Sequence, residues 1–238
     1  MKILVSGGGG KLATHLGRVG RERGHEMLLL KRKDMDVSRP NVVERVLQQE
    51  RADVLIHTAA ELNLENPDAL VQTNIIGSAM VANACRRSST KLVYISTDHV
   101  YSTDSQEKNE PDPLLPFSDY GWSKLGGECA AQTCPGALIV RGAFCPTPYP
   151  HPQAFRDVVK NLIYQDVASG IILDCLEFEG VLNIGSERSE SLFDFARRSR
   201  PEVGEATSPK SYVPKRSVIS TKRLRQLLAR RQEDNEDR

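Results

Sequence analysis

Short apolar segments recur along the first 141 residues and alternate with longer segments in which apolar residues return at helical spacing. We predict buried strands at residues 2–6, 27–30, 53–57, 91–96 and 137–141. Helices are predicted at residues 11–23, 40–49 and 120–133, with a longer helix that opens at Asn66 and Pro67. Because the strands are apolar throughout rather than alternating, the pattern predicts an α/β protein with a parallel sheet that helices cover on both faces.

The regular alternation weakens after Arg141. A proline-rich stretch at residues 145–153 predicts a rigid surface linker. We then expect a helix over 154–170, a strand over 180–185 and a short helix over 191–199. The last stretch, residues 222–238, predicts a charged helix that frays into a disordered tail. The predicted organisation is a core over residues 1–145, a smaller lobe over 146–225 that is partly interleaved with the core, and the charged, disordered tail over 226–238.

Composition excludes several classes of function. Lysine and arginine total 32 against 31 acidic residues, and the net charge of +1 provides no field to attract nucleic acid. The sequence has no apolar run near the length of a membrane span, and its N-terminal run is too short for a signal peptide. The five cysteines lack the close spacing of a zinc site, so we expect no metal. We expect a cytoplasmic protein that binds a small molecule, without nucleic acid or membrane partners.

A glycine-rich loop, SGGGGKLA, follows the first predicted strand and opens the first predicted helix. At such a junction the free N–H groups of the helix bind a pyrophosphate, and glycine lets the backbone approach it. We therefore expect contacts with a dinucleotide at Gly7, Gly10, Lys11 and Leu12. The alternative interpretation is a flexible turn.

The second predicted strand ends in the basic run Lys31, Arg32 and Lys33. An NAD site usually has an acidic residue there, which binds the ribose hydroxyls. Cations at this place pair instead with a 2′-phosphate, so the sequence favours NADP(H) over NAD(H). The alternative is an ordinary solvated turn.

Tyr120 and Lys124 are four residues apart on one face of a predicted helix. An ammonium beside a phenol favours the phenolate, which makes tyrosine a better proton donor and acceptor near neutral pH. The fourth predicted strand ends in Ser96 and Thr97, whose hydroxyls could orient the carbonyl that the tyrosine protonates. The alternative for the tyrosine and lysine alone is an exposed helix face.

The stretches DVLIHTAA, YISTD, YGWSKLGGE and IVRGAF, together with the glycine loop, resemble the extended short-chain dehydrogenase/reductases. Within these, the chain is most similar to the dTDP-4-dehydrorhamnose reductase branch of sugar-nucleotide enzymes. The resemblance implies a Rossmann-type doubly wound parallel sheet with a small C-terminal substrate lobe. It extends over residues 1–141 and returns weakly in YQDVA, GVLNIGSERSESLFDFA and PKRSVISTKRL.

The resemblance implies a catalytic triad. Thr97 would hydrogen-bond the substrate, Tyr120 would be the general acid, and Lys124 would anchor the nicotinamide ribose and lower the pKa of the tyrosine. Further cofactor contacts are implied at Asp36 and Val37, at Ala59 and Ala60, and at Asn74, for which a polar core contact is the alternative.

Asp98 and His99 follow the strand-end threonine. In the resembling sugar-nucleotide dehydratases an Asp-Glu pair stands there as the acid and base of water elimination. His99 takes the place of that glutamate, so we favour reduction of a ketone over elimination, although histidine is able to serve as a base. The alternative for His99 is a packed ring with no proton role. We expect substrate contacts at Asp98, His99 and Arg216.

The substrate lobe is shorter than the resemblance implies, so three functions stay open. The favoured one is NADPH-dependent reduction of a nucleotide-linked 4-keto-6-deoxy sugar or a related ketone. The second is a non-catalytic NADP-binding regulatory module of the same fold, and the third is a sugar-nucleotide epimerase or dehydratase. The resemblance also implies a homodimer.

Overall fold

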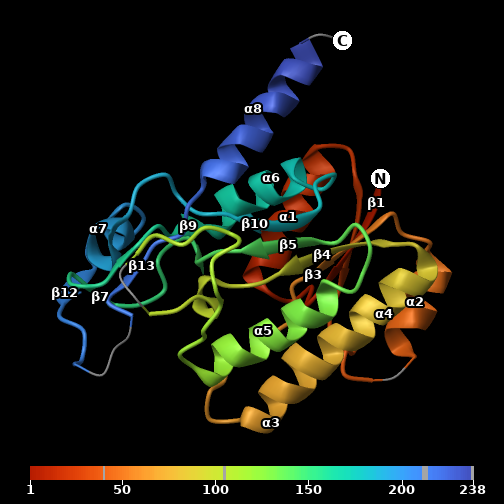
Figure 1. The fold of residues 1–238 in the computed structure, drawn as a ribbon, viewed down its shortest axis with the longest axis horizontal. Coiled ribbons are helices and arrows are strands. Elements are labelled where there is room, and N and C mark those ends of the chain that lie inside the picture. The colour runs from red at the N-terminus through yellow and green to blue at the C-terminus, as the bar shows by residue number, and fades with distance from the viewer. Residues whose placement is uncertain (40, 104–105, 211–213, 237–238) are drawn as a thin grey trace.

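Six parallel strands form one central sheet in the part of the chain that the structure describes (Figure 1). This computed structural model describes residues 1–39, 41–103, 106–210 and 214–236. In spatial order the strands are β10 (Gly180–Asn183), β5 (Leu138–Arg141), β4 (Lys91–Ile95), β3 (Val54–His57), β1 (Lys2–Ser6) and β2 (Glu26–Leu30). The chain winds outward from β1 in both directions, which confirms the doubly wound parallel sheet.

Helices cover both faces of the sheet (Figure 1). One face carries α1 (Lys11–Glu22) and α6 (Gln165–Asp174), and the other carries α2 (Val42–Glu50), α4 (Ser78–Ser88) and α5 (Asp119–Ala131). Side chains alternate between the two faces along each strand, so Ile3 and Val5 pack under α1 and α6 while Leu4 packs under α2 and α4. The need to fill two cores explains why these strands are apolar throughout.

The predicted long helix after Asn66 consists of three segments. They are α3 (Pro67–Leu70), a π-helical segment η1 (Val71–Gly77), and α4. The Asn66 side chain caps the first segment by accepting a hydrogen bond from the Ala69 N–H at 3.1 Å. At the second predicted helix, Pro40 lies outside the described residues, and α2 begins at Val42.

The C-terminal lobe contains short strand pairs around an apolar cluster that includes Val158, Phe193 and Phe195. The strands are β6 (Phe144–Cys145) with β9 (Ile163–Tyr164), β7 (Gln153–Phe155) with β12 (Gly204–Ala206), and β8 (Val159–Lys160) between β11 (Glu190–Ser191) and β13 (Arg216–Ser217). A short helix, α7 (Leu192–Arg197), packs against them. From this part of the chain, β10 pairs with β5 of the central sheet, and α6 packs in the core cluster on one of its faces.

Two expectations for this lobe were wrong. The segment 154–170 is not one helix, because β7, β8 and β9 precede α6, which begins at Gln165. Its buried residues Val158 and Ile163 belong to different apolar clusters, so tertiary contacts override the local pattern. The proline-rich stretch is also more than a surface linker, since Tyr149 is only 8% exposed.

The last segment was expected to be a charged helix that frays into a disordered tail over residues 226–238. In the structure α8 (Lys222–Glu236) continues through most of it, with Leu224 buried and Leu227 and Leu228 packed against the core cluster of α1 and α6. The last two residues of that range lie outside the described part of the chain. Among the described residues, no helix is both long enough and apolar enough to cross a membrane.

Candidate active site

A cavity of about 620 Å³ lies at the carboxyl ends of β1 to β5. The switch point of the sheet is between β1 and β3, where ligands bind in open α/β sheets. The predicted site residues that line the cavity are Gly7, Gly10, Lys11, Leu12, Arg32, Asp36, Val37, Ala59, Ala60, Thr97, Asp98, His99, Tyr120 and Lys124. Lys31, Asn74 and Arg216 are not part of its wall.

The glycine loop forms a tight cradle at one end of this cavity. Gly7 has a φ of +69°, and a Cβ there would stand 2.8 Å from the Ala59 backbone. A Cβ on Gly8 would stand 2.5 Å from the backbone of β2. Gly10 is the N-cap of α1, and the first helical residues, Lys11 and Leu12, line the cavity. The positive end of the helix dipole therefore lies at the cavity. The cradle fits a dinucleotide pyrophosphate.

The basic run after β2 contributes one side chain to the cavity. Arg32 lines it and remains 77% exposed, with Nε 3.5 Å from Asp36 Oδ2. The Asp36 carboxylate also accepts a hydrogen bond from the Ser38 hydroxyl at 2.6 Å. Lys31 is exposed outside the cavity wall. A 2′-phosphate at this rim would meet Arg32.

Asn74 supports the cavity wall from behind. Its side chain accepts from the Glu61 N–H at 2.8 Å and donates to the Glu61 carbonyl at 2.9 Å. It also donates to Ser123 Oγ on α5 at 2.9 Å. These contacts correspond to the polar core contact that the sequence left as the alternative, and they fix the loop after β3 against the helix of Tyr120.

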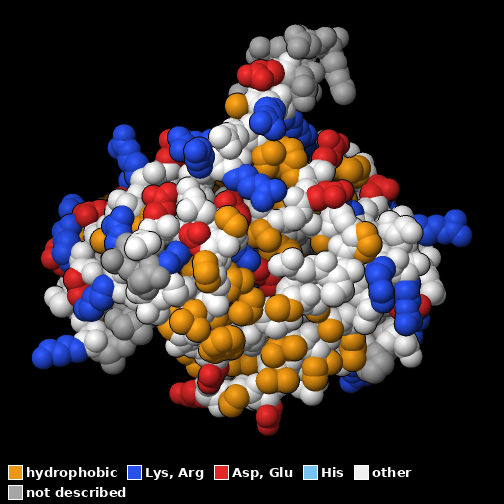
Figure 2. Space-filling model, in the orientation of Figure 1, with side chains coloured by type: hydrophobic (Ala, Val, Ile, Leu, Met, Phe, Trp, Pro, Cys, Tyr) orange, Lys and Arg blue, Asp and Glu red, His pale blue; other side chains and the backbone are white. Residues whose placement is uncertain are grey.

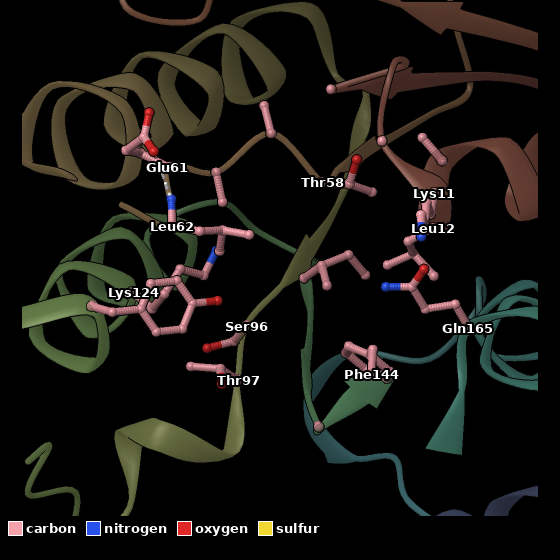
Figure 3. Close-up of a pocket in the computed structure, with 18 of the residues that line it drawn as sticks. Lys11, Leu12, Thr58, Glu61, Leu62, Ser96, Thr97, Lys124, Phe144 and Gln165 are labelled. Carbon is pink, nitrogen blue, oxygen red and sulfur yellow. Dashed lines mark hydrogen bonds between the residues drawn. The ribbon is translucent and has the colours of Figure 1, made fainter. Parts of the chain in front are cut away.

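Thr97, Tyr120 and Lys124 all line the cavity. Thr97 and Lys124 lie on one side of it, and Lys11, Leu12, Phe144 and Gln165 lie across from them (Figure 3). Thr97 is the last residue before a short 3₁₀ turn, Asp98–Val100. Ser118 positions α5 by capping it through a hydrogen bond from the Gly121 N–H at 3.1 Å. Tyr120 and Lys124 follow one helical turn apart.

Burial shifts the pKa values of Tyr120 and Lys124 in opposite directions. Burial raises the pKa of Tyr120, the Asp98 carboxylate also raises it, and a hydrogen bond with the Thr97 hydroxyl lowers it, which leaves a value of about 12. Burial lowers the pKa of Lys124 to about 7, against a raising effect of Glu128. Lys124 Nζ lies 4.2 Å above the Tyr94 ring centroid. Lys124 is not among the groups that shift the pKa of Tyr120, so its expected lowering effect on the tyrosine stays a prediction.

Asp98 and His99 meet a lysine that the sequence did not single out. Lys160 Nζ, on β8, donates to Asp98 Oδ2 at 3.0 Å and lies 3.3 Å from His99 Nε2. Ser217 Oγ donates to the same Asp98 oxygen at 2.8 Å, and Thr97 Oγ1 donates to Asp98 Oδ1 at 3.3 Å. Arg216 precedes Ser217 on β13 but is exposed outside the cavity wall.

Other lining residues also escaped sequence reasoning. They include Thr58, Glu61, Leu62, Phe144, Lys160 and Gln165. Three of them, Thr58, Phe144 and Gln165, stand in the DVLIHTAA, IVRGAF and YQDVA stretches, whose resemblance was the one available signal for them. Glu61, Leu62 and Lys160 carry no motif, because they come from loops and from the lobe.

A buried ion pair holds the strand ends behind Thr97. Arg141 donates to Glu128, and Glu128 Oε2 accepts from Ser96 Oγ at 2.8 Å. Arg141 also donates to the Tyr101 hydroxyl at 2.9 Å, which in turn donates to Asn183 Oδ1 at 2.8 Å. This network joins β4, α5, β5 and β10, so it fixes the strand tip on which Thr97 stands.

The doubly wound sheet, the glycine cradle and the tyrosine–lysine helix together define a dinucleotide-binding protein of the extended short-chain dehydrogenase/reductase type. A family model described as RmlD substrate binding domain matches residues 1–174. The chain belongs to this family, and the resemblance found in its sequence is confirmed.

Relatives in sequence include named sugar-nucleotide enzymes. The dTDP-4-dehydrorhamnose reductase of Mycobacterium tuberculosis is 31% identical over 153 residues, covering 60% of this chain and 50% of that protein. The spore coat polysaccharide biosynthesis protein SpsK of Bacillus subtilis is 32% identical over 146 residues, covering 59% and 52%. The chain thus spans about half the length of the curated relatives it matches.

Solved structures share the fold over nearly the whole chain. A dTDP-4-dehydrorhamnose reductase from Bacillus anthracis, in complex with NADP, superposes with a TM-score of 0.86 at 22% identity, covering 95% of this chain and 92% of that one. WbmG of Bordetella bronchiseptica, in complex with NAD, has a TM-score of 0.82 at 20% identity, covering 95% and 87%.

The lowered pKa of Lys124 generates a stability prediction. The unfolded chain takes up the lysine proton near pH 10.5, whereas the folded protein does so only near pH 7. The free energy of unfolding should therefore fall as the pH decreases from about 10.5 to about 7. Lys124→Met removes this cost, so we expect the variant to be more stable than the wild type at pH 7, by as much as ~4 kcal/mol.

Urea denaturation at pH 7 and pH 10, without cofactor, measures this difference. The matched control is Lys33→Met at an exposed lysine, which should change the stability little at either pH. A Lys124→Met variant that is less stable than the wild type at pH 7 would contradict the burial cost.

Proposed function

We propose that this protein is an NADPH-dependent reductase that acts on the ketone of a nucleotide-linked 4-keto-6-deoxy sugar. The observation that carries the proposal is that Thr97, Tyr120 and Lys124 line the same cavity as the glycine cradle. Relatives named dTDP-4-dehydrorhamnose reductase support the substrate class. The free state of all five cysteines fits a cytoplasmic protein.

The residues around the cavity fit a nicotinamide dinucleotide. Gly7, Gly10 and Leu12 would hold the pyrophosphate, and Arg32 would pair with the 2′-phosphate that distinguishes NADP from NAD. Asp36 and Val37 would contact the adenine, while Ala59 and Ala60 would lie along the cofactor. When bound, the reduced cofactor supplies the hydride.

The residues of the chain supply the proton and the positioning. Tyr120 would donate its phenolic proton to the ketone oxygen while hydride reaches the carbon, which gives an alcohol, and solvent would then return a proton to the tyrosine. Its pKa of about 12 keeps the donor protonated at neutral pH. Thr97 would orient the same oxygen, and Lys124 would bind the nicotinamide ribose hydroxyls.

Elimination, and epimerisation through removal of a carbon-bound proton, are less well supported than reduction. Both need a base beside the substrate, and Asp98 is already held by Lys160 and Ser217. The Nε2 atom of His99 faces the same lysine. A non-catalytic NADP-binding module remains as an outcome of the activity test below.

A homodimer is the quaternary structure that we propose. Val71 on η1 is 43% exposed and Trp122 on α5 is 50% exposed, as are the nearby loop residues Leu62 and Leu64 at 67% and 55%. Figure 2 shows a broad apolar area over α3 and α5. An exposed apolar area on two adjacent helices is suited to pairing with a second copy.

Tyr120→Phe tests the catalytic proposal. The variant keeps the ring but loses the proton donor, so we expect the rate of NADPH consumption with a dTDP-4-keto-6-deoxy sugar to fall by about a hundredfold or more. NADPH binding, followed by fluorescence titration, should change little. Wild-type protein that binds NADPH without consuming it would indicate the non-catalytic module.

Arg32→Ala tests the cofactor preference. Loss of a charge-assisted hydrogen bond to the 2′-phosphate should weaken NADPH binding by about ten- to a hundredfold and leave NADH binding nearly unchanged. The matched control is Lys33→Ala, since Lys33 is exposed and outside the cavity wall. Equal losses for both cofactors would argue against the assigned role of Arg32.

Trp122→Glu tests the dimer. A buried charge at the interface should convert a dimer to a monomer in light scattering after size exclusion. Val167→Glu is the control, because Val167 is equally exposed, at 53%, on α6 at the opposite face of the sheet. A wild type that is monomeric at tens of micromolar, about the usual working concentration, would exclude the dimer.

A further inference from the structure

A cluster of three titratable side chains borders the cavity next to Tyr120, and the proposed mechanism does not use it. Asp98 and Lys160 are nearly inaccessible, with side chains 3% and 7% exposed. His99 is 32% exposed. Asp98 and His99 belong to the turn after β4, whereas Lys160 comes from β8 of the C-terminal lobe.

Lysine chemistry decides how the protons in this cluster are arranged. An ammonium has three donors and no acceptor, so it can approach another polar atom this closely only where that atom accepts. Lys160 Nζ is 3.0 Å from Asp98 Oδ2 and 3.3 Å from His99 Nε2. His99 Nε2 must therefore present its lone pair, and the ring proton of the neutral imidazole must be on Nδ1.

The other neighbours of His99 do not prevent Nε2 from accepting a hydrogen bond from Lys160. The Tyr120 ring on α5 stands edge-on at a centroid distance of 5.9 Å, and the Phe117 ring lies at 4.9 Å. Asp98 Oδ1 is 3.9 Å from His99 Nε2 and is the one acidic group in contact with the ring among the described residues. By itself that carboxylate would favour a protonated imidazolium, whereas burial and the Lys160 ammonium both oppose protonation.

We propose that Lys160 is a positioning residue that, by donating to Asp98 and to Nε2 of His99, holds His99 as the neutral Nδ1–H tautomer and leaves Tyr120 as the proton donor at the substrate carbonyl. The inference rests on the proposed reductase function for its catalytic part. A histidine whose Nε2 lone pair faces an ammonium cannot take a proton from a substrate carbon. Lys160 thereby suppresses the elimination chemistry that His99 could otherwise support.

The protonation preferences agree with this arrangement. Burial lowers the pKa of His99, Asp98 raises it, and Lys160 lowers it, with a net value below the usual one. Burial raises the pKa of Asp98, but the Lys160 ammonium, His99 and the Ser217 hydrogen bond together bring it well below its ordinary range.

The test is nitrogen NMR of the histidine rings, without substrate, in the wild type and in Lys160→Met. The chain has only five histidines, and His99→Gln assigns the signal. Ser217→Ala is the matched control, because it removes the other side-chain hydrogen bond to Asp98 Oδ2 and leaves the Lys160–His99 contact in place. Should Lys160→Met fail to fold, Lys160→Met with Asp98→Asn removes both buried charges together.

We expect the wild type and Ser217→Ala to show His99 as the neutral Nδ1–H tautomer. In both proteins the pKa of His99 should lie below the usual value of histidine. Lys160→Met should release Nε2 and raise the pKa of His99, since Lys160 then no longer opposes the effect of Asp98. With Asp98→Asn in addition, the tautomer should still become mixed while the rise in pKa disappears. A wild-type Nε2–H tautomer, or His99 signals unchanged in both Lys160 variants, would overturn the proposal.

Turnover gives an independent readout. With NADPH and a dTDP-4-keto-6-deoxy sugar, Lys160→Met should lower kcat, since His99 beside Tyr120 is then no longer held in one protonation state. Its pH profile should gain a limb at the raised pKa of His99. A wild type that consumes no NADPH would remove the proposed function, whereas the NMR result alone decides the tautomer.

Discussion

The buried carboxylate of Asp98 is the contact on which the geometry of the site depends. It stands at the carboxyl end of β4 and accepts hydrogen bonds from Lys160 on β8, Ser217 on β13 and Thr97 beside it. Burying an ionised carboxylate is costly unless it is paired and hydrogen-bonded, and breaking such a pair costs about 3–5 kcal/mol. The two lobe strands are therefore fixed to the core at the point where Thr97 meets the cavity.

The site contains two buried lysines whose surroundings differ. Lys160 contacts a carboxylate, whereas Lys124 lies against the Tyr94 ring and has its pKa lowered by burial. Lys160 links the lobe to the core through Asp98, whereas the burial of Lys124 lowers the free energy of unfolding at neutral pH. A cation that is poorly satisfied by the protein is well suited to meet ligand hydroxyls, which is the usual trade between stability and activity at functional sites.

Local sequence patterns predicted the core well, because its strands, helices and glycine loop each have a signature within a short stretch of sequence. The five core strands were placed to within one residue at either end, and the glycine loop, Thr97, Tyr120 and Lys124 lie around one cavity as expected. The lobe was not predictable in the same way. Its strands are two or three residues long and pair with distant segments, so neither strand nor helical periodicity develops in them. Lys160 falls in such a strand, within a segment whose pattern favoured a helix.

The position of Lys160 in the lobe affects how reactions can be assigned to proteins of this fold. The residue after Asp98 was the natural place to distinguish reduction from elimination, because a glutamate there would serve as the base of elimination. The histidine found at this position, His99, is also able to act as a base, so its identity alone does not exclude elimination. Whether His99 can accept a proton depends on the atom opposite its Nε2, and that atom belongs to Lys160, which is 61 residues further along the chain. The strand-end motif thus provides the groups, while the lobe sets their protonation. A substitution in the lobe could change the chemistry without altering any residue of the motif.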